Sequence, residues 1–200
     1  MVETAKKYLT ALNKAVTVDV MERRLLLVNH GKQLWTRERA REIRTELIKI
    51  FEGLQPGEAG VIDCKGVEVF DYSFANELFG KTLLSLSREY PERFLLVENL
   101  TDYTRENLSK ALESLGLIMI ERKANKLALL GRVHPADLET FNVIAASREP
   151  LTAVALKGKL GINLTAVNER LSKLTGLALI RRQMGVSGAG RQHYTYLAPA

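Results

Sequence analysis

The chain has 200 residues, 46% of them hydrophobic, which allows one large or two small domains with real cores. Its single cysteine excludes an internal disulfide framework, and no apolar run approaches the roughly 20 residues of a membrane span. Residues 1–130 hold 20 Lys and Arg against 19 Asp and Glu, whereas residues 131–200 hold 9 against 4. The basic C-terminal third therefore favours a polyanionic partner, usually nucleic acid. Because residues 1–7 lack the apolar core of a signal peptide, we expect a cytoplasmic protein with no membrane partner.

The first 58 residues predict two helices and two strands. Apolar spacing indicates a short helix over residues 8–15, and alternation over 16–20 indicates a half-buried strand. A second strand over 24–29 could form a hairpin with it. Thr36 is placed to cap a helix that ends at Gly53 and the turn 55–57. The predicted inner face of that helix consists of Ala40, Ile43, Leu47, Ile50 and Leu54.

The stretch Ala59–Lys81 predicts a strand followed by a helix. Residues 60–64 form a short apolar run, and extended chain is expected to continue to Asp71. Ser73 stands where the helix should begin, so its hydroxyl is predicted to cap the free N–H groups. The same geometry suits a phosphoserine, because a helix N-terminus attracts anions. The residues alone leave both interpretations open.

This stretch resembles the STAS domain, the fold of anti-anti-sigma factors. The matching segments are the strand Val61–Asp63, the turn Asp71-Tyr72-Ser73 and the helix from Phe74 onward. It is more similar still to a STAS-like family of unknown function, whose members carry a pattern like SFANELFGK, here residues 73–81. An upstream helix of that family begins with a pattern like Thr-Arg-Glu, here residues 36–38.

The STAS resemblance also implies a site and a partner. In phosphorylated STAS domains the acceptor lies in the Asp-Ser-Ser turn, so the resemblance implies Ser73, beside Asp71, as a phosphorylation or partner-docking site. The partner it implies is a kinase or an anti-sigma-type protein.

Residues 82–131 continue the alternation of strands and helices. A strand is expected over 94–97, a helix capped by Thr101 or Thr104 and closed by Gly116, and a strand over 117–120 that pairs with the run 127–130 as a hairpin. The order predicts an α/β domain over residues 1–131, and the resemblance implies that its mixed sheet with helices is STAS-like. The boundary is expected at residues 131–135.

Residues 132–200 predict a second, smaller α+β domain. One helix runs from Ala136 to about residue 149; Thr152 caps a second helix and Asn163 a third, across a tight turn at Gly161. Strands over 177–182 and 192–197 flank a glycine-rich tip at 185–190. Residues 154–196 resemble the winged helix-turn-helix of bacterial and archaeal transcription regulators, including a Leu-Gly-Ile turn at 160–162.

The winged-helix resemblance implies double-stranded DNA as a partner and a homodimer on paired half-sites. Thr165 and Asn168 lie near the start of the third helix, where they would face bases. The basic side chains would contact phosphates. The predicted DNA-binding residues are Lys157, Lys159, Thr165, Asn168, Arg170, Lys173, Arg181, Arg182 and Arg191.

Nothing in the sequence argues for catalysis or for a cofactor. The three histidines are isolated from one another and from the cysteine, and no phosphate-binding glycine loop precedes a helix. We therefore expect a transcription regulator in which a signal-receiving domain is coupled to a DNA-binding domain. The alternative is a partner-switching adaptor whose C-terminal domain docks a protein, since Leu164 and Glu169 are poor phosphate contacts.

Overall fold

The computed structural model describes residues 23–124, 126–186 and 192–199, so the helix and strand expected over residues 8–20 lie outside it. The α/β part contains β1 (Arg23–Leu26), a 3-10 turn η1 (Leu27–His30), β2 (Gln33–Leu34), α2 (Arg37–Gly53), β3 (Ala59–Asp63), β4 (Val69–Phe70), α3 (Tyr72–Ala75), a π-turn η2 (Asn76–Gly80), α4 (Lys81–Glu89), β5 (Phe94–Glu98), α5 (Asp102–Leu115), β6 (Ile118–Lys123) and β7 (Lys126–Gly131). The C-terminal part contains α6 (Pro135–Ala145), β8 (Leu151–Thr152), α7 (Ala153–Leu160), α8 (Leu164–Gly176), β9 (Arg181–Val186) and β10 (Gln192–Leu197).

A mixed sheet among helices forms the centre of the molecule, as predicted, and the described chain gives it five strands. Its strand order is β1-β3-β5-β6-β7; the first four strands are parallel and β7 is antiparallel to β6. The expected strand over 24–29 is shorter, because the chain turns at Leu27, and it pairs in parallel with β3. The expected extension beyond β3 is also shorter: only β4 is extended, and it pairs with β2 in a separate small sheet.

Local capping explains where the helices begin. Thr36 Oγ1 accepts a hydrogen bond from Arg39 N at 3.4 Å, which confirms that predicted cap. Of the two candidates for α5, Thr101 is the cap, since its Oγ1 accepts a hydrogen bond from Thr104 N at 3.1 Å. Gly116 ends α5 at φ +65°, a left-handed conformation that favours glycine. On α2 the inner face is as predicted, except that Phe51 is buried and Ile50 only partly so.

Both faces of the five-stranded sheet are covered. One face packs with α2, α3, α4 and α5, and this cluster includes Ile62 and Val97. The other face contributes Val61 and Leu96 to a second cluster, whose remaining members come largely from α6, α7, α8 and the chain around them. Successive strand residues point to opposite faces, so the same strands serve both cores. The C-terminal part therefore packs against the face of the sheet that the first set of helices leaves open.

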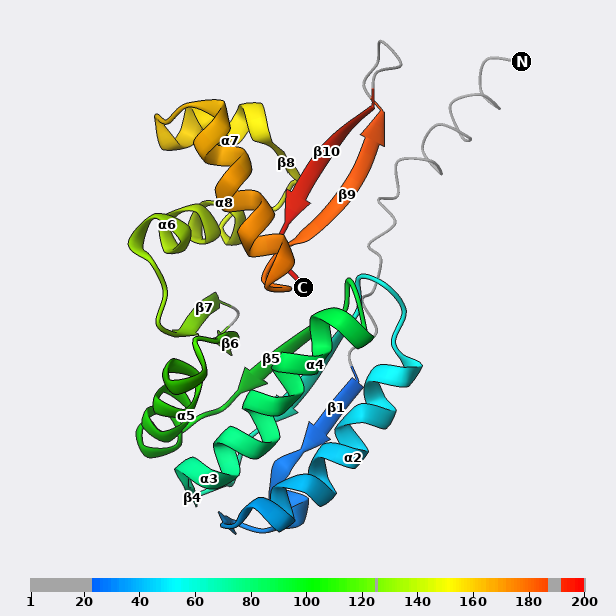
Figure 1. Cartoon of the computed structure of the whole chain (residues 1–200), viewed down its shortest axis with the longest axis vertical. Coiled ribbons are helices and arrows are strands. Elements are labelled where there is room, and N and C mark those ends of the chain that lie inside the picture. Colours follow the sequence, from blue (N-terminus) through cyan, green and yellow to red (C-terminus); the bar gives the residue numbers. More distant parts are fainter. Residues whose placement is uncertain (1–22, 125, 187–191, 200) are drawn as a thin grey trace, which may run out of the picture.

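The C-terminal part combines three helices with an antiparallel three-stranded sheet of order β8-β10-β9. Figure 1 shows β9 and β10 as a long hairpin beside α7 and α8. Two boundaries differ from expectation: α6 ends at Ala145 rather than near residue 149, and β9 begins at Arg181 because residues 177–180 form a turn. That turn carries Leu179 and Ile180 into the second core.

In the parts of the chain that the structure describes, every helix is too short or too polar to cross a lipid bilayer.

Candidate functional site

The pair α7 and α8 is built by local caps and a buried stripe. Thr152 Oγ1 accepts a hydrogen bond from Ala155 N at 3.1 Å, and Asn163 Oδ1 accepts one from Ala166 N at 2.8 Å, which confirms both predicted caps. Gly161 closes α7 at φ +65°. Because Val167 and Leu171 are buried, the opposite side of α8 is turned toward solvent.

The predicted base-reading residues lie on this outer side. Thr165 and Asn168 are both exposed. Leu164, the residue that follows the Asn163 cap, is 40% exposed. Lys157 and Lys159, near the end of α7, are also exposed, and neither forms an ion pair with any described residue. These four polar side chains therefore remain available for an external partner.

Two other predicted cations are turned toward α6. Arg170 Nη1 lies 3.2 Å from Thr140 Oγ1 and 3.3 Å from Glu139 Oε2. Lys173 Nζ lies 2.5 Å from Asp137 Oδ2, whose side chain is buried. Since salt bridges to α6 satisfy both, these cations tie α8 to α6.

The three remaining predicted arginines lie elsewhere. The guanidinium of Arg182 stacks 4.6 Å above the centre of the Tyr194 ring, across β9 and β10. The guanidinium of Arg181 lies against Gly57 of the α/β part. Arg191 lies outside the described residues. The eight described members of the predicted set thus do not gather on one surface.

The Ser73 turn differs from the prediction in one respect. Asp71, and not Ser73, is the N-cap of α3: its Oδ1 accepts a hydrogen bond from Phe74 N at 2.7 Å. Ser73 is the second residue of the helix and is half-buried. The predicted serine cap is wrong because the aspartate two residues earlier is placed to bond Phe74 N, and a charged acceptor caps at least as well as a hydroxyl.

One turn further along, a buried carboxylate escaped the sequence reasoning. Glu77 lies in the π-turn η2 and is 1% exposed. Its Oε1 lies 3.2 Å from Arg41 Nε and 3.6 Å from Arg44 Nη2, and its Oε2 lies 2.7 Å from Lys81 Nζ. Burial raises the pKa of Glu77, but the hydrogen bonds and charges of Lys81 and Arg41 outweigh burial and hold it below its usual value. The carboxylate fastens α2 to the helix that follows β4.

Charged side chains also meet at the carboxyl ends of the parallel strands, the edge where α/β sheets often bind ligands. Arg24 Nη1 lies 2.6 Å from Glu98 Oε2 and 3.6 Å from Asp63 Oδ2. Arg122 donates to the other Glu98 oxygen. Asp63, Glu98 and Arg122 each follow or interrupt an apolar strand run, and Arg24 directly precedes one, which is the sequence signal that could have found them. Because they pair with one another, they close this edge.

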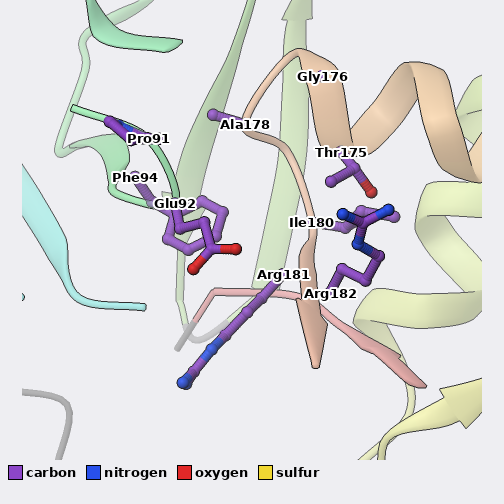
Figure 2. A pocket seen from close by; sticks show the side chains of 9 residues that line it. All are labelled: Pro91, Glu92, Phe94, Thr175, Gly176, Ala178, Ile180, Arg181 and Arg182. Atoms are coloured by element: carbon purple, nitrogen blue, oxygen red, sulfur yellow. The ribbon is translucent and has the colours of Figure 1, made fainter. Parts of the chain in front are cut away.

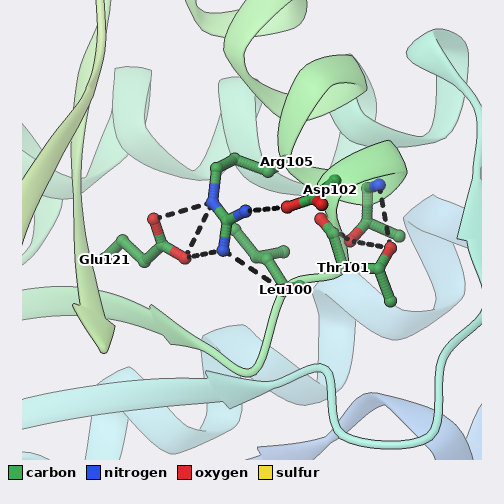
Figure 3. Close-up of polar contacts among 6 residues, drawn as sticks. Leu100, Thr101, Asp102, Arg105 and Glu121 are labelled. Carbon is green, nitrogen blue, oxygen red and sulfur yellow. Dashed lines mark hydrogen bonds and ion pairs between the residues drawn. The ribbon is translucent and has the colours of Figure 1, made fainter. Parts of the chain in front are cut away.

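A second ionic contact joins α5 to β6 (Figure 3). Arg105 Nη2 lies 2.7 Å from Glu121 Oε1 and its Nε 3.1 Å from Oε2, while its Nη1 donates to Asp102 Oδ1 at 2.8 Å. The same guanidinium donates to the Leu100 carbonyl at 3.2 Å. The arginine therefore has partners on every side and acts as a structural clamp.

Two observations on the described residues concern metal binding and nucleophilic chemistry. Across residues 23–124, 126–186 and 192–199, no three His, Cys, Asp or Glu side chains gather as a metal ion would require. Cys64 is 1% exposed, and burial, followed by the charges of Asp63 and Glu121, raises the pKa of its thiol far above the usual value. A thiol in that state is a poor nucleophile.

Comparison of the chain with protein-family models, with curated proteins and with solved structures finds no match.

Proposed function

We propose that the chain is a cytoplasmic transcription regulator whose C-terminal part, residues 132–200, is a winged helix-turn-helix that binds double-stranded DNA. The order of elements supports this proposal: a helix, a short strand, two helices joined by a glycine turn, and a hairpin that pairs with the short strand. The STAS-like α/β part would receive the signal. A homodimer would place two copies of α8 on paired half-sites.

The proposal rests mainly on the solvent-exposed side of α8. Its apolar stripe is fixed in the second core, so Thr165 and Asn168 are presented outward from a rigid helix. In a major groove, Asn168 would pair with adenine and Thr165 with a base or a phosphate. Lys157 and Lys159, which have no acidic partner among the described residues, would contact the flanking phosphates.

A pair of matched charge reversals tests the proposal. In the full chain, Lys157→Glu with Lys159→Glu should weaken binding to duplex DNA at least tenfold at low salt, since two phosphate contacts are lost. Lys49→Glu with Lys65→Glu changes the net charge equally on exposed sites of the α/β part and should have much less effect. Equal effects of the two double variants would mean that the protein's overall charge, and not this surface, attracts DNA.

The second candidate is an adaptor whose C-terminal part docks a protein. Among the described residues there, five large apolar side chains are exposed: Leu138 at 36%, Val154 at 68%, Leu164 at 40%, Met184 at 62% and Tyr194 at 46%. Exposed apolar side chains of this kind favour a protein contact over a phosphate contact. Absence of any DNA affinity at low salt in the full chain would favour the adaptor.

Signal reception is proposed at the Ser73 turn, by phosphorylation or by docking of a kinase or anti-sigma-type protein. A phosphate on Ser73 would lie beside the N–H groups of the first turn of α3, but also near the Asp71 carboxylate that already caps it. Ser73→Asp and Ser73→Ala should therefore differ in partner affinity. If both variants bound the partner as tightly as the wild-type protein, Ser73 would have no part in signal reception.

A further inference from the structure

A pocket lies between the two parts of the molecule (Figure 2). One wall is the segment Pro91–Phe94, between α4 and β5; the other runs from Thr175 at the end of α8 to Arg182 in β9. Its volume is about 210 Å³. That exceeds the ~150 Å³ of an engineered cavity that accommodates benzene and is smaller than the ~300 Å³ at which drug-sized sites begin. The pocket suits a small metabolite with one ring or a short chain.

The pocket combines an apolar floor with a positive balance of charge. Phe94 and Ile180 line it and are each 1% exposed. Glu92 contributes one carboxylate, and Arg181 and Arg182 contribute two guanidinium groups. Among the described residues, none of these three forms an ion pair. The net charge favours a ligand that has an apolar body and one negative group.

A polar group already buried at the pocket indicates where the ligand's negative group would lie. The hydroxyl oxygen of Thr175 is buried and forms no hydrogen bond with any described residue. Figure 2 shows this hydroxyl and the Arg182 guanidinium on one side of the pocket and the Glu92 carboxylate on the other. An unpaired buried hydroxyl costs about 1–3 kcal/mol, so a ligand that bonds it recovers that cost.

The backbone around the pocket is strained. Glu92 has φ +59° and Ala178 has φ +52°, and these are two of the five non-glycine residues with positive φ in the described chain. Such conformations cluster at ligand clamps, where the surrounding structure holds them in place. Both residues line the pocket.

We propose that this pocket binds a small amphipathic carboxylate, which bridges the α/β part and the C-terminal part. The carboxylate group accepts hydrogen bonds from Thr175 and pairs with Arg182, while the apolar body lies on Phe94 and Ile180. Glu92 accepts from any O–H or N–H donor at the far end of the ligand. This site is independent of the proposed DNA binding.

Benzoate is the probe, with neutral benzamide as its matched control, in calorimetric titration of the full chain. Benzoate should bind saturably at one site per chain, and at least tenfold more tightly than benzamide. Arg182→Gln should weaken benzoate binding about tenfold, whereas Arg148→Gln, at an exposed arginine that does not line the pocket, should leave it unchanged.

Two further variants test the same site if Arg182→Gln disturbs folding. Thr175→Val should weaken benzoate binding about three- to tenfold while leaving the melting temperature of the free protein unchanged or higher. Gly176→Leu adds a side chain at the pocket wall, where a Cβ meets nothing within 4 Å, and should abolish binding. The proposal is overturned if benzoate does not bind saturably, if benzamide binds as tightly, or if both of these variants retain wild-type affinity.

Discussion

The capping role of Asp71 gives the sharpest test of the α/β part. Asp71→Ala removes the acceptor of the 2.7 Å hydrogen bond from Phe74 N and leaves that N–H without a partner beside a fully buried ring. Loss of such a cap costs about 1–2 kcal/mol. In a protein of this size, 1 kcal/mol corresponds to about 2–4 °C in melting temperature. Asp71→Ala should therefore lower the melting temperature by about 2–8 °C.

Two companion variants make this assay decisive. Asp71→Asn keeps an acceptor at the same place and should retain most of the stability. Ser73→Ala removes a hydroxyl that does not cap the helix, so the free energy of unfolding should change by less than about 0.5 kcal/mol. Thermal unfolding and urea unfolding, both followed by circular dichroism, give the melting temperature and the free energy of unfolding of all three variants. If Ser73→Ala were as destabilising as Asp71→Ala, the assignment of the cap to the aspartate would be refuted.

Three other features lead to distinct measurements. Because the pKa of Glu77 is lower in the folded chain than its ordinary 4.5, its stabilising contribution is complete above pH 4.5 and is lost as pH falls through the folded value; Glu77→Gln should cost about 1–3 kcal/mol at pH 7 and flatten that acid dependence in urea titrations. Phe141→Ala should lower the free energy of unfolding by about 3–5 kcal/mol. Because the second core joins both parts, the unfolding transition seen by fluorescence of Trp35, in the α/β part, should move to lower urea as well. A Trp35 transition that does not move would contradict a shared core. Cys64 should resist a thiol reagent at pH 8 in the native protein and react fully in urea, whereas rapid native reaction would show that the strand is accessible.

Much of the fold could be predicted because the signals are local. Thr36, Thr101 and Asn163 each lie three residues before the N–H group that they cap, and apolar spacing then identifies the inner face of each helix. The alternation of strands and helices likewise predicted a mixed sheet with a final hairpin.

The errors arise where neighbouring residues or distant segments compete. Asp71 and Ser73 are both good capping residues two positions apart, and propensity alone does not decide which one is placed to bond Phe74 N. Parallel pairing of β1 with β3 joins segments about 37 residues apart, so no turn signal announces it.

The candidate DNA surface shows the same limit. Composition identified a cluster of cations, but the distribution of those cations depends on where α6 and the α/β part lie. Arg170 pairs with Glu139, and Arg181 lies against Gly57. These contacts join residues that are about 31 and 124 positions apart in the chain. Lys157 and Lys159 have no such partners in the described chain, and for this reason the charge-reversal variants are placed at these two residues.

The proposed binding of duplex DNA by the C-terminal part depends on phosphate contacts, so the salt dependence of full-chain affinity is the measurement that decides it. Affinity for a duplex should fall steadily as salt rises, with a slope of log affinity against log salt of about −0.9 for each phosphate contacted. Lys157→Glu with Lys159→Glu should make that slope shallower by about 2. Negligible affinity at low salt, or an affinity that does not change with salt, would contradict the claim.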